Sequence, residues 1–239
     1  MKVKLVSFTV PCIDDLPLDS DVLDLIAFCA RVSNPSNQGN TDNSEKLINY
    51  LIKHKHWSPF EMADVTIEIE TTRDIARQIL RHRSFSFQEF SQRYADPTID
   101  LDFVYREARL QDTKNRQNSI EVDDYQLQLQ WVYQQEEVLN AAKKAYAWAI
   151  EKGIAKEVAR AVLPEGLTMS RMYMKGSIRS WIHYLEVRTD PSTQKEHREV
   201  AVACAQAIAE IFPMITNSVH PSNSLPTEFV KVETTVQDA

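Results

Sequence analysis

Glycine is scarce in this chain of 239 residues, which has 4 glycines where average usage would give about 17. No two of them lie close enough together for a G-x-G-x-x-G turn or a P-loop, the glycine-rich loops that commonly hold nucleotide phosphates. The sequence therefore excludes a Rossmann-type dinucleotide site. Any nucleotide that the protein binds must be held by side chains.

Cysteines and long apolar runs are also few. Cys12, Cys29 and Cys204 are far apart, which excludes a C-x-x-C redox motif or a thiolate zinc cluster and is typical of a reduced, cytoplasmic protein. The longest apolar runs, such as residues 200–205, are far shorter than the ~20 residues that cross a bilayer. No secretory cleavage signal follows the first residues, so we expect neither a membrane span nor export.

Positive charge is in the minority, since 27 lysines and arginines stand against 34 aspartates and glutamates and give a formal net charge of −7. Such a surface as a whole repels nucleic acid, so any anion site must be a local concentration of arginine. The hydrophobic share of 43 % and the charged share of 26 % are typical of a globular protein with a packed core.

Apolar periodicity predicts a mixed fold. Alternating residues predict strands at 2–10, 65–70 and 169–175, and helical spacing predicts helices at 22–32, 44–54, 73–83, 124–152, 155–163, 178–187 and 193–212. Residues 84–100 show no sustained period, and the polar residues 111–119 predict a mobile loop. No repeat or composition break divides the chain. We therefore expect a single catalytic α+β domain over residues 1–220, rich in helix and with a small, mostly antiparallel sheet, followed by a polar tail at 221–239.

The chemical centre of the sequence is the predicted helix at 73–83, for which residues 71–72 offer an N-cap. It places Arg73, Arg77 and Arg81 four residues apart on one face. Like charges at that spacing destabilise a helix by about 0.2–0.5 kcal/mol per pair, so negative groups must compensate.

Two interpretations of this arginine face stay open. In the first, Glu70, Asp74 and Glu89 neutralise a solvated helix face; in the second, Arg81-His82-Arg83 at the helix end binds phosphate. Residues 84–94 favour the second interpretation. They combine hydroxyls, an amide, a carboxylate and a further arginine, which can hold an anion, with three phenylalanines that exclude water.

Arg81-His82-Arg83, followed after seven residues by Ser91, matches R-H-R-x7-S, the signature of the flavin-dependent thymidylate synthases. Further segments resemble that family in the same order. They are His56-Trp57-Ser58-Pro59-Phe60-Glu61, Gln78 three residues before Arg81, Arg160-Ala161-Val162-Leu163-Pro164, and the helix that carries Arg179, His183 and Arg188. On these ordered segments, within residues 56–190, the chain is identified as a member of the family.

The resemblance implies an enzyme that methylates dUMP to dTMP, with methylenetetrahydrofolate as carbon donor and with FAD, reduced by NADPH, as hydride carrier. It also implies a homotetramer whose active sites combine residues of several subunits. The residues implied for FAD are Ser58, Arg81, His82, Arg83, Glu89, Ser177, Arg179 and His183. The residues implied for dUMP are Gln78, Arg81, Glu89, Ser91, Gln92, Arg93, Arg160 and Arg188. Ser177 and His183 stand where some relatives have asparagine, and both can still hydrogen-bond a flavin.

Arg188 is expected to be the main catalytic side chain. It lies in the last turn of its predicted helix, just before residues 189–191, where the helix dipole favours a cation that can stabilise charge on the uracil ring. The alternative is a surface arginine paired with Glu186 or Asp190. Ser91 has no histidine and acid at triad-like positions, so it is expected to orient the nucleotide without forming a covalent bond.

The remaining histidines and Cys12 have less informative patterns. His54 and His56 lack acidic or cysteine neighbours at ligand spacing, so no metal site is expected. His197 and His220 are interpreted as structural or exposed residues. Cys12 follows a proline, as does the nucleophile of the cysteine-dependent thymidylate synthases, but the rest of that pattern is missing and we interpret it as a buried apolar residue.

The alternative function is a nucleic-acid-binding module in which residues 73–93 grip phosphates. The negative net charge and the absence of other basic clusters weigh against it. We therefore expect small-molecule substrates, and neither nucleic acid nor a membrane as partner.

Overall fold

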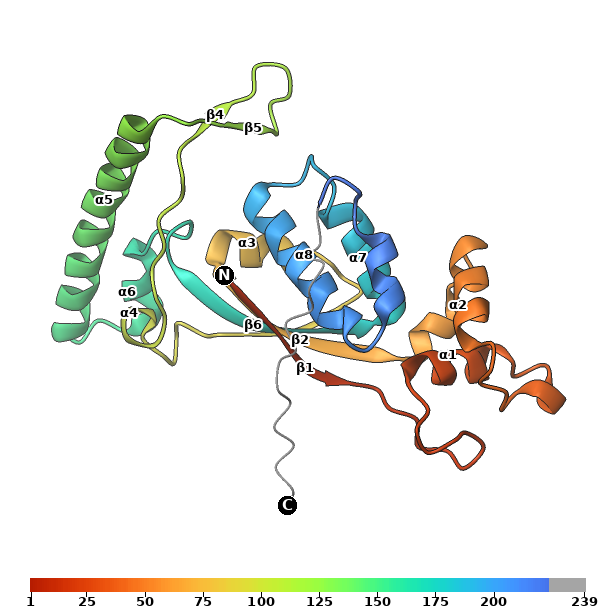
Figure 1. Cartoon of the computed structure of the whole chain (residues 1–239). Helices are drawn as coiled ribbons and strands as arrows, with labels where there is room; N and C mark the ends of the chain where they lie inside the picture. Colours follow the sequence, from red (N-terminus) through yellow and green to blue (C-terminus); the bar gives the residue numbers. More distant parts are fainter. Residues whose placement is uncertain (224–239) are drawn as a thin grey trace.

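The computed structural model of the chain describes residues 1–223. Its centre is a four-stranded sheet in the order β1-β2-β6-β3, built from strands far apart in the sequence (Figure 1). The strands are β1 (Lys2–Phe8), β2 (Asp64–Thr72), β3 (Ser86–Glu89) and β6 (Met169–Ser177). All strand pairs in this part of the chain are antiparallel, which confirms the predicted α+β class with a small antiparallel sheet.

Alternation along β2 explains which face of the sheet is covered. Val65, Ile67 and Ile69 are fully buried, while the residues between them are only partly buried. The buried side chains join one apolar core with α7 (Ile178–Arg188) and α8 (Lys195–Ala209). These two helices lie on the same face of the sheet (Figure 1).

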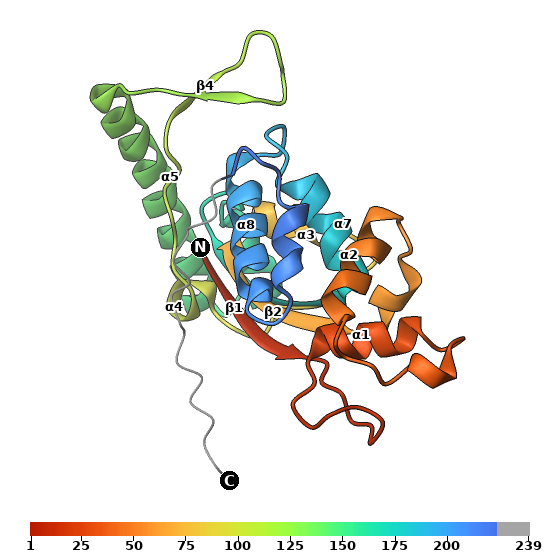
Figure 2. The same ribbon diagram turned by 45° about the vertical axis from the view of Figure 1, so that its right-hand side comes forward.

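Two short helices lie together at one end of the sheet (Figure 2). Asp21 caps the first of them, because its carboxylate accepts hydrogen bonds from the backbone N–H groups of Leu23 and Asp24. The elements of this end are α1 (Val22–Ala30), the 3₁₀ helices η1 (Pro35–Asn37) and η2 (Ser58–Met62), and α2 (Ser44–Lys53); η4 (Pro213–Ser218) packs against α8.

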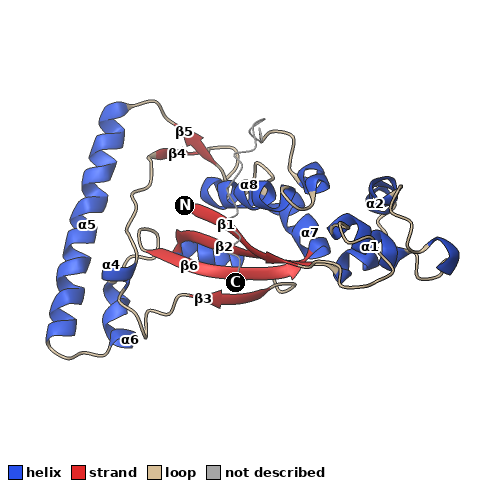
Figure 3. Ribbon diagram, turned by 60° about the horizontal axis from the view of Figure 1, so that its bottom comes forward, coloured by secondary structure: helices blue, strands red, loops and turns tan. Residues whose placement is uncertain are grey.

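A long helix stands apart from the sheet at the other end (Figures 1 and 3). It is α5 (Tyr125–Glu151), which begins where Asp124 accepts a hydrogen bond from the Leu127 N–H. It ends before Gly153, whose φ of 75° lies in the left-handed region that favours glycine. The other elements near α5 in sequence are α4 (Pro97–Asp100), β4 (Arg109–Gln111), β5 (Ser119–Glu121), α6 (Lys156–Ala159) and η3 (Arg160–Val162).

The arginine-rich helix is shorter than predicted. It is α3 (Arg73–Ile79), so Arg81-His82-Arg83 lies in the turn that follows it and not in its last turn. Thr72 occupies the N-cap position, but its hydroxyl accepts a hydrogen bond from Arg106 and caps no backbone group. The helix prediction to residue 83 was wrong because the chain turns back there to pair β3 with β6.

Two segments without a helical or strand prediction have regular structure. β3 lies within residues 84–100, where its pairing with distant β6 supplies hydrogen bonds that no local period reveals. Residues 111–119, predicted as a mobile loop, complete a β4–β5 hairpin, and Asp112 accepts hydrogen bonds from two backbone N–H groups of its turn. The predicted polar tail lies outside the described residues from residue 224 onward, and the domain boundary stays a prediction.

Candidate active site

The predicted site residues, together with Glu61, fall into three groups. The His82 group comprises Gln78, Arg81, His82 and Arg188; the Glu61 group comprises Ser58, Glu61, Ser177, Arg179 and His183; the Glu89 group comprises Glu89, Ser91, Gln92, Arg93 and Arg160. Arg83 is exposed in the turn after His82 and belongs to none of them. Within residues 1–223, no hydrogen bond or ion pair joins the side chains of one group to those of another.

Arg188 and His82 meet although they are 106 residues apart in the sequence. Arg188 lies in the last turn of α7, as predicted, and its Nε donates to His82 Nε2 at 2.8 Å. That nitrogen of His82 is therefore unprotonated, and the ring proton sits on Nδ1. Burial, with Arg188 and Arg81 nearby, lowers the pKa of His82 to about 4. The imidazole is neutral at neutral pH, so it leaves the charge of the guanidinium available to a ligand.

Neither acidic neighbour pairs with Arg188. Glu186 lies 3.3 Å from His183 Nδ1, and Asp190 accepts hydrogen bonds from Ser192. Burial lowers the pKa of Arg188 from its ordinary value, although a guanidinium stays protonated at any physiological pH. The surface-ion-pair alternative for Arg188 is therefore wrong.

A buried tyrosine and a buried histidine lie behind His82. The rings of Tyr184 and His82 pack edge to face with 4.9 Å between their centroids. Tyr184 Oη lies 3.1 Å from His197 Nε2, and His197 Nδ1 lies 3.3 Å from Gln78 Oε1. Both side chains are almost fully buried, which places His197 in the structural class predicted for it. No motif pointed to either residue as a neighbour of the site.

The Glu61 group joins η2 to the start of α7. Glu61 accepts a hydrogen bond from Ser177 Oγ at 2.6 Å, and it forms an ion pair with Arg179 Nη1 at 2.9 Å. Ser177 Oγ also caps α7, because it accepts from the Ser180 N–H at 3.3 Å. Glu61 was not among the predicted site residues, although it ends the quoted His56–Glu61 motif. That motif was the signal that could have identified it.

The second feature of this group is an aromatic contact. His183 packs edge to face against Trp57, with 4.7 Å between the ring centroids. Trp57 is only partly buried, so one side of the pair faces the surface. A planar ligand can therefore reach these rings from solvent.

The Glu89 group lies at the other end of β3. Glu89 accepts a hydrogen bond from Ser170 Oγ at 2.8 Å and lies 3.8 Å from Arg73. Gln92 is only 3 % exposed, and its amide nitrogen has no hydrogen-bond partner within residues 1–223. A buried donor without a partner is costly, so a ligand carbonyl or phosphate oxygen would stabilise it.

The arginine stripe divides between structural and uncommitted side chains. Arg77 pairs with Glu165 at 2.6 Å, and Arg93 pairs with Glu157 at 3.0 Å. In contrast, Arg81, Arg83 and Arg160 have no carboxylate within 4.0 Å in the described part of the chain. Of the acidic partners predicted for the solvated face, only Glu89 lies near the stripe, 3.8 Å from Arg73, whereas Asp74 pairs with Arg106 and Glu70 with Arg171. The anion interpretation is left for the arginines of the turn and of η3.

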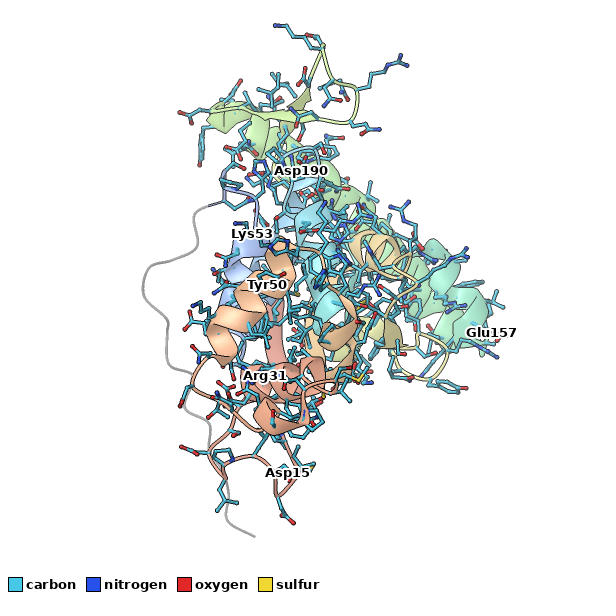
Figure 4. The ribbon with its side chains drawn as sticks, turned by 90° about the vertical axis from the view of Figure 1, so that its right-hand side faces the viewer. Asp15, Arg31, Tyr50, Lys53, Glu157 and Asp190 are labelled. Atoms are coloured by element: carbon cyan, nitrogen blue, oxygen red, sulfur yellow. The ribbon has the colours of Figure 1, made fainter. Side chains whose placement is uncertain are left out.

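The His82 group and the Glu89 group both lie close to α3. Figure 4 labels Asp190, in the loop after α7, near its top and Glu157, on α6, at its right-hand side. Helix α3 lies next to both groups, since it carries Gln78 of the His82 group and Arg73, which lies 3.8 Å from Glu89. The two groups are thus neighbours at α3, but no side-chain hydrogen bond or ion pair connects them within residues 1–223.

Membrane spans and metal clusters are both missing from residues 1–223. No helix there is both long and apolar enough to cross a membrane, and no three histidine, cysteine or acidic side chains gather as metal ligands would. Cys12 is exposed, contrary to the buried position predicted for it, because it lies in the loop after β1. Cys204 is fully buried, and burial raises the pKa of its thiol.

The fold and the site together define an α+β protein that can bind anions through arginine side chains and not through a glycine-rich loop. Comparison with known proteins narrows this class. The model of the thymidylate synthase complementing protein family matches residues 18–214. The flavin-dependent thymidylate synthase of Synechocystis sp. is 51 % identical over 217 residues, which cover 90 % of this chain and 97 % of that protein.

Two further matches agree. A probable flavin-dependent thymidylate synthase of Paramecium bursaria Chlorella virus 1 is 46 % identical and aligns over 91 % of this chain and 98 % of its own length. The crystal structure of a UMP/dUMP methylase from Streptomyces cacaoi bound with 5-Br UMP has a TM-score of 0.74 and 26 % identity, covering 91 % of this chain and 92 % of that one. The chain belongs to the flavin-dependent thymidylate synthase family.

Proposed function

We propose that this protein catalyses the flavin-dependent reductive methylation of dUMP to dTMP. The observation that carries the proposal is the contact between Arg188 and His82. Two motifs that define the family by sequence, far apart along the chain, meet in a half-buried cluster that keeps an uncompensated positive charge. Family membership at about 50 % identity over most of the chain supports the same reaction.

FAD is the cofactor that the family implies, and the turn after α3 fits it. Arg81 and Arg83 are exposed and have no carboxylate partner among the described residues, so they are free to pair with a diphosphate. We assign Ser58, Ser177, Arg179 and His183 to the same cofactor, with Trp57 and His183 offering an aromatic edge. FAD, when bound, supplies the hydride.

We assign the binding of dUMP to the other predicted residues, mainly through their arginine and amide side chains. Arg160 and Ser91 are uncommitted donors suited to a phosphate, and the unpaired amide nitrogen of Gln92 fits a ligand oxygen. Glu89 is already held by Ser170 and Arg73, which fixes its orientation toward either ligand. If Arg93 binds dUMP, its guanidinium must leave the ion pair with Glu157 and contact the substrate instead.

Arg188 is the catalytic side chain of this proposal. Its guanidinium, held by neutral His82, stabilises negative charge that develops on the uracil ring. Ser91 Oγ contacts only the Arg93 N–H at 3.4 Å among the described residues, so no base activates it as a nucleophile. Burial raises the pKa of Cys29 and Cys204, which disfavours their thiolates. The enzyme therefore acts without forming a covalent bond to the substrate.

The co-substrates and the compartment are further parts of the proposal. We infer that NADPH reduces the flavin and that methylenetetrahydrofolate donates the carbon, as in the family the chain belongs to. The three cysteines are scattered and form no disulfide within residues 1–223, which supports a cytoplasmic setting.

A homotetramer with shared sites is supported by two observations. No hydrogen bond or ion pair joins the His82 group to the Glu89 group within residues 1–223, as expected if a second copy of the chain completes the pocket. Helix α5 also exposes large apolar side chains, including Trp131, Tyr133 and Trp148, and a hollow of about 510 Å³ beneath it is lined by Trp131, Val138 and Leu167. Apolar surface of this kind marks protein–protein contacts.

The absorbance of bound flavin and the formation of dTMP test the proposal. The purified protein with FAD should show oxidised-flavin absorbance that bleaches on adding NADPH, and should form dTMP only when dUMP and methylenetetrahydrofolate are both present. A protein that takes up no FAD and instead binds single-stranded DNA would establish the nucleic-acid alternative.

A further inference from the structure

The row of side chains behind His82 contains a histidine with no assigned role. His197 is fully buried near the start of α8, between Tyr184 at 3.1 Å and Gln78 at 3.3 Å. Gln78 Nε2 donates to Gln194 Oε1 at 2.8 Å, and Gln194 Nε2 donates to Glu196 Oε2 at 2.9 Å. The row therefore runs from a buried tyrosine, through Gln78, to a carboxylate.

The carboxylate fixes the direction of every hydrogen bond in this row. Glu196 pairs with two arginines of the segment before α5, and these arginines lower its pKa, so it is ionised and can only accept. Gln194 must therefore turn its nitrogen to Glu196 and its oxygen to Gln78. Gln78 must then turn its nitrogen to Gln194 and its oxygen to His197. His197 consequently carries its proton on Nδ1 and accepts from the Tyr184 hydroxyl at Nε2.

The electrostatic surroundings agree with a neutral His197. Burial, together with Arg188, His82 and Arg81, lowers its pKa to about 3. A protonated ring would donate from both nitrogens and would leave the buried Tyr184 O–H without an acceptor among the described residues. The neutral ring accepts from Tyr184 and donates to Gln78, so it satisfies both of its neighbours.

We propose that His197 is a positioning residue that, together with Gln194, holds the Gln78 amide in one place and one orientation, so that a defined N–H and a defined lone pair face dUMP. This rests on the proposed function, because it takes Gln78 to contact the nucleotide. A primary amide has two N–H groups and two oxygen lone pairs. His197 and Gln194 occupy one of each, so one N–H and one lone pair remain to recognise the polar edge of the nucleotide.

Three substitutions at His197 separate the contributions of its two ring nitrogens. Asparagine places its amide nitrogen near the Nδ1 position and keeps a donor for Gln78. Glutamine reaches the Nε2 position and keeps a partner for Tyr184 only. Phenylalanine keeps the bulk of a ring and supplies neither.

Dissociation constants for dUMP, measured on the FAD-loaded enzyme, test the proposal. His197→Gln and His197→Phe should weaken dUMP binding about 3–10-fold, the value of one hydrogen bond, while His197→Asn stays within about twofold of the wild type. Flavin reduction by NADPH without dUMP should be the same in all variants. Equal effects of asparagine and glutamine, or no effect of any substitution, overturn the positioning role. A wild-type enzyme that binds no dUMP would instead overturn the proposed function.

The direction of the row can be measured without any variant. Nitrogen NMR of the histidine rings at about pH 5 should show His82 and His197 as neutral rings with the proton on Nδ1. A neutral ring with its proton on Nε2 under these conditions contradicts the arrangement.

Discussion

A single arginine can be a structural side chain or a catalytic one, depending on its partner. Arg179 and Arg93 each face a carboxylate, which neutralises most of their field. Arg188 instead donates to a neutral imidazole, and it is only partly exposed, so its charge is less screened by water. At the level of single residues, the proposed mechanism therefore depends on the pair formed by Arg188 and His82.

Removing that guanidinium should slow the chemical step. Arg188→Ala is expected to lower the rate of dTMP formation about 100–1000-fold, the usual cost of losing one preorganised donor to transition-state charge. Arg188→Lys should recover only part of the rate, because a point charge does not reproduce the planar guanidinium. Rapid mixing should show flavin reduction by NADPH nearly unchanged in both variants. Equal losses in the two steps would remove Arg188 from the catalytic role.

The two buried histidines should make folding stability depend on pH. The pKa is about 4 for His82 and about 3 for His197, below the ordinary histidine value of 6.5. Unfolding therefore takes up protons below about pH 6.5, and stability is full above that pH and falls as the pH drops.

Substitution of His197 should reduce this dependence. Near pH 5 the free energy of unfolding of the wild type should fall more steeply than that of His197→Phe, by about 1.4 kcal/mol per pH unit for one proton. Denaturant titrations at a series of pH values measure the two slopes. Parallel slopes would show that His197 is protonated in the folded protein.

At the scale of elements, α7 connects two of the three groups. Its N-cap Ser177 belongs to the Glu61 group, and its last-turn Arg188 belongs to the His82 group. Phe85 holds the turn after α3 against this helix, with its ring 4.9 Å from that of Trp181. The ring can lie so close to β6 because Gly176 has no side chain: a Cβ there would lie 2.5 Å from the Phe85 ring.

A methyl group at position 176 should therefore displace Phe85. Gly176→Ala is expected to lower the free energy of unfolding by about 1–3 kcal/mol, as overpacking of a core does. Gly166→Ala is the matched control, because a Cβ there meets nothing within 4 Å and should leave stability nearly unchanged. Thermal and denaturant unfolding of both variants measure the difference. Equal stabilities would mean that Phe85 can move at no cost.

Local signals predicted most of the elements. The apolar alternation of β2 and the helical spacing of α1 and α5 are properties of neighbouring residues, and these three predictions are confirmed. The end of α3 and the existence of β3 depend on pairing with β6, which is distant in the sequence (Ser86 pairs with Lys175), so no local period contained them.

In the candidate site, too, the sequence predicted what neighbouring residues determine and missed the contacts between distant segments. Motif spacing identified His82 and Arg188, but not that they would contact each other. His197 and Tyr184 lay on apolar helix faces, where they resembled ordinary core residues, and only the packing of α7 on α8 shows their polar contacts. The assignment of individual residues to FAD or dUMP rests on the family motifs, and it stays a prediction.

At the scale of the whole molecule, the distribution of the site residues is the main constraint. Within the described residues no hydrogen bond or ion pair joins the His82 group to the Glu89 group, while the family motifs assign residues of both groups to one substrate. The exposed apolar side chains of α5 offer a surface on which copies of the chain can associate. Under the proposed shared active site, an isolated chain should be inactive, because Arg81 of one subunit would act together with Arg160 of another.

Mixing two inactive variants tests whether subunits share an active site. Arg81→Ala and Arg160→Ala should each abolish dTMP formation alone. When the two proteins are dissociated and reassembled together, some sites receive the intact Arg81 of one chain and the intact Arg160 of the other, and activity should partly return. Mixtures that remain inactive, with subunit exchange verified by differently tagged chains, would contradict the shared active site.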